Sequence, residues 1–215
     1  MSCVTHPLEI HLRDLGKPLV ESWAREFAGV ASVTTSCGDI FSTKPGFIHA
    51  GDPVDVKADA IVSPANSFGF MDGGIDAVYT YQFGEGLQRR LQELISTEFG
   101  GELPVGMAVI VPTMHNDIPW CISAPTMRVP QNVAETVNAY LAFRAALRAV
   151  VAHNANGQSQ IKRVLCPGLG TAVGQMPVAR CARQMRAAWD SVFAPKAAMP
   201  RSVRAAADDE IELLR

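Results

Sequence analysis

The sequence lacks any long apolar run and any block of five like charges. No apolar stretch approaches the roughly 18 residues that a membrane-spanning helix requires. Nineteen basic against 21 acidic residues give a net charge of -2, so a general electrostatic attraction to nucleic acid or to a membrane is not expected. The first residues do not join a charged segment to an apolar one, and we therefore expect a cytoplasmic protein.

Cysteine is scarce, and the spacings that bind metal are absent. The five cysteines are odd in number and lie mostly in apolar contexts, which is typical of reduced thiols in a core rather than of a disulfide framework. They are Cys3, Cys37, Cys121, Cys166 and Cys181. No CxxC or HxxxH spacing occurs, so we expect no structural zinc. We also expect no other metal and no cofactor.

Apolar residues are plentiful and evenly spread, which favours one compact unit. Hydrophobic residues make up 48% of the 215 residues and charged residues only 19%. We predict a single domain over residues 1–193 and a peripheral, Ala-rich tail over residues 194–215 that can form a helix. Residues 41–58, rich in proline and glycine, are long for a connection and predict an ordered surface excursion.

Strand and helix patterns alternate along the whole domain. Gly84 and Gly86 are expected to break the helical pattern at 75–99 into two helices. The alternation predicts a three-layer α/β fold around a mixed, largely parallel sheet, with ligands beyond the carboxyl ends of the strands. In chain order the patterns are a strand at 8–12, a helix at 19–27, strands at 31–36 and 58–62, a helix at 75–99, strands at 107–111 and 118–122, a helix at 132–153, a strand at 164–166 and a helix from 177.

A glycine-rich segment, residues 167–177, follows the last strand and precedes the last helix. In this position backbone N–H groups and the positive end of the helix dipole bind phosphate. Only about 40 residues follow, too few for the rest of a dinucleotide-binding fold, and no Walker lysine is present. The alternative is a tight strand-to-helix turn without a ligand.

Residues 63–76 form the second glycine-bearing segment at a strand end. Asn66 offers both a donor and an acceptor to a sugar hydroxyl, Gly73 and Gly74 permit close backbone approach, and Asp76 can orient a water or a hydroxyl. The alternative is structural: Asp72 or Asp76 caps the following helix, and Asn66 satisfies groups of the turn.

Together with Gly38-Asp39-Ile40, these segments resemble the macrodomain family of ADP-ribose-binding proteins. The similarity rests on 38–40, on Asp59-Ala60-Ile61-Val62 followed by Ala65-Asn66, on Gly73-Gly74-Ile75-Asp76 and on 170–174 before Pro177. It spans residues 31–193, and its four pieces occur in the order found in the family. The resemblance implies a macrodomain-like α/β/α fold.

The resemblance also implies a role for each matching residue. Asp39 would accept a hydrogen bond from the adenine amino group beside the backbone of Ile40; alternatively it only ends a strand in a turn. Asp76 would activate or organise a water at the distal ribose, and Asn66 would hold that ribose. The remaining contacts to the ribose and the diphosphate would come from Gly73, Gly74, Ile75, Gly170, Thr171, Ala172, Val173 and Gly174.

Some positions depart from the family pattern. Hydrolytic members commonly have Asn-Ala-Ala-Asn where this chain has Ser63-Pro64-Ala65-Asn66, and a histidine where it has Thr80. An aromatic residue expected after Gly174 is absent. Binding tolerates these changes more readily than one particular hydrolytic mechanism does.

The chain is therefore interpreted as an ADP-ribose-binding macrodomain that hydrolyses an ADP-ribosyl bond, with Asp76, Asp72 and Asn66 as catalytic residues. Asp72 and Asp76 would share the work, one polarising water and the other bonding a ribose hydroxyl or the leaving group; alternatively Asp72 faces solvent. The expected partners are ADP-ribose and an ADP-ribosylated protein or small molecule, bound by a monomer. The alternatives are a reader of ADP-ribose without turnover and a nucleotide-binding enzyme unrelated to ADP-ribosylation.

Overall fold

The strands of the described residues form one sheet in the order β2-β1-β6-β3-β5-β4. The computed structural model describes residues 8–42, 54–157, 159–194 and 199–215. All neighbouring strands are parallel except β4 and β5, which are antiparallel, so the prediction of a mixed, largely parallel sheet is confirmed. The strands are β1 (Glu9–Asp14), β2 (Val33–Cys37), β3 (Ala60–Ser63), β4 (Val109–Pro112), β5 (Trp120–Ser123) and β6 (Arg163–Cys166).

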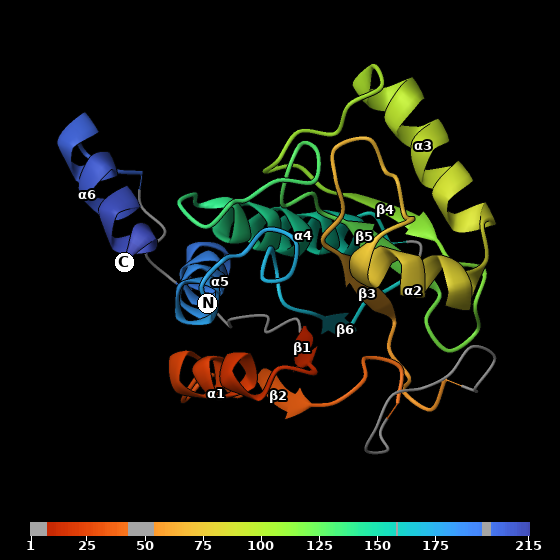
Figure 1. The fold of residues 1–215 in the computed structure, drawn as a ribbon, viewed down its shortest axis with the longest axis horizontal. Helices are drawn as coiled ribbons and strands as arrows, with labels where there is room; N and C mark the ends of the chain where they lie inside the picture. The colour runs from red at the N-terminus through yellow and green to blue at the C-terminus, as the bar shows by residue number, and fades with distance from the viewer. Residues whose placement is uncertain (1–7, 43–53, 158, 195–198) are drawn as a thin grey trace.

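Helices cover both faces of this sheet (Figure 1). Side chains alternate along a strand, so Ala60 and Val62 join the core of α1, α4 and α5, whereas Ile61 joins the core of α2 and α3. The expected three-layer α/β/α arrangement is confirmed. The helices are α1 (Lys17–Glu26), α2 (Gly74–Phe83), α3 (Gly86–Phe99), α4 (Asn138–Ala155), α5 (Val178–Phe193) and α6 (Val203–Leu214).

Of two helix boundaries predicted from local sequence, one agrees with the structure and one does not. The break between α2 and α3 is confirmed, because Gly84 adopts a φ of 78°, outside the helical region. The prediction that Asn132 caps a helix is wrong, since α4 begins only at Asn138. The backbone N–H of Val133 donates instead to the carbonyl of Gly174 at 2.8 Å, a contact that holds the preceding segment out of the helix.

The remaining segments lie at the periphery. Helix α6 stands apart from the sheet in Figure 1, has no buried residue and contacts α5 through Gln184, whose side-chain amide donates to the carbonyl of Leu213 at 3.0 Å. Most of the predicted excursion at 41–58 lies outside the described residues. Within the described part of the chain, no helix combines the length and the apolar character needed to cross a membrane.

Candidate functional site

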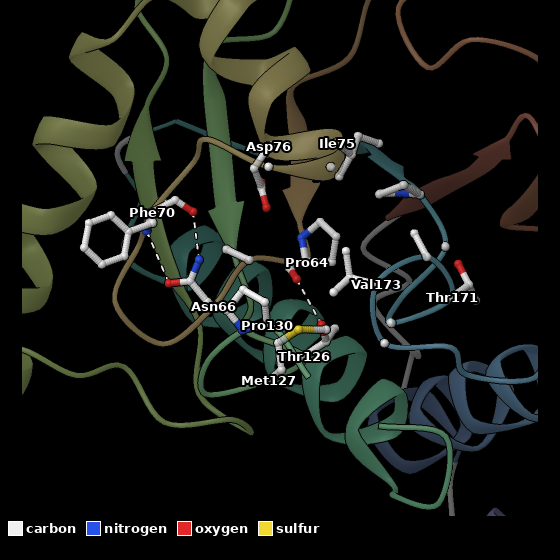
Figure 2. Close-up of a pocket in the computed structure, with 18 of the residues that line it drawn as sticks. Pro64, Asn66, Phe70, Ile75, Asp76, Thr126, Met127, Pro130, Thr171 and Val173 are labelled. Atoms are coloured by element: carbon white, nitrogen blue, oxygen red, sulfur yellow. Dashed lines mark hydrogen bonds between the residues drawn. The ribbon is translucent and has the colours of Figure 1, made fainter. Parts of the chain in front are cut away.

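A cavity opens beyond the carboxyl ends of β1, β3, β5 and β6 (Figure 2). Its volume of about 200 Å³ lies below the roughly 300–1,000 Å³ of a typical small-molecule site, so a larger ligand would extend beyond it. Both glycine-bearing segments contribute to its wall. The lining residues are Asp14, Pro64, Ala65, Asn66, Phe70, Asp72, Gly73, Gly74, Ile75, Asp76, Thr126, Met127, Pro130, Pro167, Gly168, Gly170, Thr171, Ala172, Val173 and Gly174.

Asn66 lines the cavity and also holds its own loop together. Its side-chain oxygen accepts hydrogen bonds from the N–H groups of Phe68 at 3.1 Å and Phe70 at 3.3 Å, and its amide nitrogen donates to the carbonyl of Phe70 at 2.8 Å. The structural role proposed for Asn66 in the turn is thus present. These bonds also fix the amide at the cavity wall.

The first turn of α2 faces the cavity with unpaired backbone donors. The N-cap is Gly73, and no side chain of the described residues caps the helix, so neither Asp72 nor Asp76 has the capping role considered from the sequence. The N–H groups of the first turn have no partner within a helix. Gly74 has a φ of 58°, a conformation that other residues rarely adopt.

The second glycine-bearing segment offers a matching set of donors. Gly170 has a φ of 71°, and a Cβ on Gly174 would lie 2.5 Å from the carbonyl oxygen of Gly170. Within the part of the chain that the structure describes, the N–H groups of residues 171–173 donate to no protein acceptor. Such a run of free amides in a turn is suited to binding an anion.

Asp76 is the buried carboxyl of the site. It is 7% exposed, and its Oδ1 accepts a hydrogen bond from the Ser63 hydroxyl at 2.5 Å. Burial raises the pKa of Asp76 to about 7, although the bond from Ser63 acts in the opposite direction. Figure 2 shows the carboxyl pointing from the start of α2 into the space between the two loops. Asp72, by contrast, is exposed at the rim.

Asp39 and Ile40 are the predicted site residues that do not line this cavity. Both are buried, and Asp39 Oδ1 accepts a hydrogen bond from the N–H of Phe41 at 2.9 Å. The buried Arg13 also stabilises this turn, because its Nε donates to the carbonyl of Asp39 at 2.6 Å. A Cβ on Gly38 would lie 2.4 Å from that guanidinium. All other predicted site residues line the cavity.

Several lining residues were not identified from the sequence. Asp14 ends β1, and Thr126, Met127 and Pro130 follow β5, so the rule that ligands lie at the carboxyl ends of strands is the signal that points to them, although it does not by itself say which strand ends meet. The ionisable lining residues are Asp14, Asp72 and Asp76, all acidic. Since no basic side chain is among the described lining residues, recognition of an anion in this cavity would rest on uncharged donors, chiefly backbone N–H groups.

Arg128 lies close to this site without lining the cavity. It forms an ion pair with Glu102 at 2.8 Å and lies over the ring of Phe68. Its guanidinium therefore interacts with surface side chains, the alternative that the sequence favours over a phosphate, and not with a group in the cavity.

Comparison with known proteins identifies the architecture. Residues 62–185 match the Macro domain family. An uncharacterized protein of Aquifex aeolicus (strain VF5) is 35% identical over 135 residues, covering 63% of this chain and 74% of that protein.

Solved structures share the fold at low sequence identity. The macrodomain of Mycobacterium tuberculosis DarG has a TM-score of 0.53 at 19% identity and covers 67% of this chain and 89% of its own. An Oceanobacillus iheyensis macrodomain mutant with ADPR has a TM-score of 0.50 at 19% identity and covers 61% of this chain and 70% of its own.

Proposed function

The chain belongs to the macro domain family, and on that premise we propose that its cavity binds ADP-ribose and hydrolyses an ADP-ribosyl bond. One observation carries the proposal: two sets of free backbone N–H groups, at the start of α2 and at residues 171–173, line the same cavity as the Asp76 carboxyl. The name of the Oceanobacillus iheyensis structure, a macrodomain with ADPR, supports the choice of ligand.

In the proposed complex the diphosphate lies between the two sets of donors. Backbone amides and the N-terminus of a helix stabilise phosphate charge without a basic side chain. The distal ribose lies beside Asn66 and Asp76, and the adenine extends beyond the cavity towards Asp39 and Ile40. The Oδ1 of Asp39 is engaged by Phe41, so Oδ2 would receive the adenine amino group.

The proposed reaction is attack of water on C1 of the distal ribose. The water oxygen bonds to C1 while the bond from C1 to the target atom breaks; Asp76 takes a proton from the water, and the leaving atom receives one from solvent. A pKa of about 7 leaves part of Asp76 ionised at neutral pH, as a general base requires. Asp72, at the rim, would bond a ribose hydroxyl or the leaving group.

A reader of ADP-ribose without turnover is the second candidate, and a specific observation favours it. Asn66, proposed to hold the distal ribose, is occupied by three hydrogen bonds within its own loop. Its side chain is thereby less free to engage a reacting ribose, whereas the backbone donors proposed to bind the diphosphate are unaffected.

The substrate would be an ADP-ribosylated protein or small molecule, processed in the cytoplasm by a monomer. We place the whole site in one domain over residues 1–193, with 194–215 as a peripheral tail. The absence of basic side chains from the described cavity wall argues against general binding of nucleic acid.

Calorimetric titration with ADP-ribose, ADP and NAD tests the ligand. Tight binding of ADP-ribose with weak binding of NAD is expected, and the reverse order would contradict the proposal. Loss of label from proteins ADP-ribosylated through defined linkages then separates hydrolase from reader: timed release supports the hydrolase, and no release from any linkage leaves the reader.

A further inference from the structure

Two serines end neighbouring strands beneath the cavity and are used differently. Ser63 ends β3 and Ser123 ends β5, and the two residues are paired in the sheet register. Both are fully buried. The Ser63 hydroxyl donates to Asp76 at 2.5 Å, whereas the Ser123 hydroxyl finds no hydrogen-bond partner among the described residues.

The other ionisable groups near Asp76 form no hydrogen bond with its carboxyl among the described residues. Tyr79, from the same helix, donates its hydroxyl to the carbonyl of Val62 at 3.0 Å. Burial raises the pKa values of Tyr79 and of Cys121, on β5, and the charge of Asp76 raises both further, so both groups are neutral at neutral pH. Asp72 and Asp14 line the same cavity. Ser63 is thus the side chain that hydrogen-bonds to Asp76 within the described residues.

We propose that Ser63 is a positioning residue for Asp76: its hydroxyl fixes Oδ1, turns Oδ2 towards the cavity and stabilises the ionised carboxyl. The inference rests on the proposed function, because it concerns how Asp76 accepts a proton from the attacking water. A hydroxyl that donates to a buried carboxylate favours the ionised form. Without this bond, burial alone would keep the carboxyl protonated over a wider pH range.

Ser63→Ala tests the proposal by the pH at which Asp76 titrates. Loss of a hydrogen bond to a charged group should raise this pH by about one unit or more. The acid limb of the rate of ADP-ribose release should move upward by the same amount. At pH 7 the rate should fall about fivefold, since less of the carboxyl is ionised, and near pH 9 it should recover most of its value.

Two further variants separate positioning from a structural effect. Ser63→Thr retains the hydroxyl and should restore the profile. Ser123→Ala removes the paired hydroxyl, which forms no hydrogen bond among the described residues and does not line the cavity, and should leave the acid limb unchanged. A rate that falls equally at every pH in Ser63→Ala, or an equal shift of the limb in Ser123→Ala, would overturn the proposal.

A second readout makes the test independent of turnover. Carbon-13 NMR of the Asp76 carboxyl reports its titration directly in the intact protein. An upward shift in Ser63→Ala that Ser63→Thr reverses supports the inference even if the unmodified protein releases no ADP-ribose, in which case the hydrolase proposal alone fails. An unchanged titration in Ser63→Ala contradicts the inference whatever the activity.

Discussion

The two glycine-bearing sides of the cavity offer a ligand different chemistry. Residues 63–76, the reactive side, bring Asn66, Asp72 and Asp76 to the wall, whereas residues 167–174, the backbone side, bring no ionisable side chain. Both sides present N–H groups that donate to no acceptor among the described residues. In the proposed complex, binding of the diphosphate would therefore be shared between the two sides, while proton transfer would involve the reactive side alone. Changes on the reactive side should alter turnover, and changes on the backbone side should alter affinity.

The largest effect is expected from Asp76→Ala on the reactive side. Loss of a general base should lower the rate of ADP-ribose release by about a hundred- to ten-thousandfold, while the affinity for ADP-ribose stays close to that of the unmodified protein. Single-turnover kinetics and calorimetry measure the two quantities separately. Asp72→Ala should also lower turnover. Unchanged turnover in both variants would remove the carboxylate pair from the mechanism.

Asp76→Asn should show how much the buried carboxyl of the reactive side lowers the free energy of unfolding. Burial raises the pKa of Asp76 to about 7, whereas an unfolded Asp titrates near about 3.9. The folded state binds the proton more tightly, so ionisation destabilises it progressively as the pH rises from about 4 through 7. The amide variant stays neutral and should be more stable at pH 8 by roughly 1–4 kcal/mol.

This advantage of Asp76→Asn should shrink as the pH falls and disappear below about pH 4, where the carboxyl is protonated in both states. Denaturant unfolding at pH 8, 6 and 4 measures the trend. If Asp76→Asn is less stable than the unmodified protein at pH 8, the claim that ionisation of the buried Asp76 lowers stability is contradicted.

On the backbone side, Gly174→Ala should weaken binding. The new Cβ would lie 2.5 Å from the carbonyl oxygen of Gly170, so the loop must shift and its N–H groups lose alignment. We expect the affinity for ADP-ribose to fall about tenfold, with little change in turnover at saturation. Titration calorimetry measures the affinity.

Gly157→Ala is the control for Gly174→Ala, because Gly157 follows α4 and does not line the cavity. It has a φ of 78°, so alanine strains the backbone there, but a Cβ would meet nothing within 4 Å. Its affinity should stay unchanged although its stability falls. Equal losses of affinity in the two variants would mean that the backbone side has no special role.

The smallest effect is expected from Ser123→Ala beneath the reactive side. Its buried hydroxyl finds no partner among the described residues, and such a group lowers stability. The variant should gain up to about 1 kcal/mol in the free energy of unfolding. Ser63→Ala, which breaks the bond to Asp76, should lose stability at pH 8. Denaturant unfolding of both variants checks the contrast, and a loss in Ser123→Ala would contradict it.

The layered fold was predictable because its signals are local. Alternating and helical apolar patterns gave the strands and helices, and Gly84 marked the break between α2 and α3. The start of α4 was not predictable from Asn132, since the N–H of Val133 is bonded to Gly174, which lies far along the chain. A tertiary hydrogen bond there overrides the local capping signal.

The candidate site likewise has parts that the sequence predicted and parts that depend on the tertiary structure. The loops after β3 and β6 were expected to meet because the carboxyl ends of parallel strands share one edge of a sheet, and those strands are neighbours. Asp39 follows β2, which proves to be an edge strand two places from β6. Strand order cannot be read from a single sequence, so its position outside the cavity was not foreseen. The hydrogen bond between Ser63 and Asp76 was not predicted either, because it forms only where the fold buries both side chains together.

The most direct test of shared diphosphate binding is a titration of the isotope-labelled protein with ADP-ribose, followed through its amide resonances. We expect the N–H signals of residues 74–76 and of residues 171–173 to shift together with one dissociation constant. Shifts confined to one of the two segments, or located away from both, would contradict a diphosphate held between the reactive side and the backbone side.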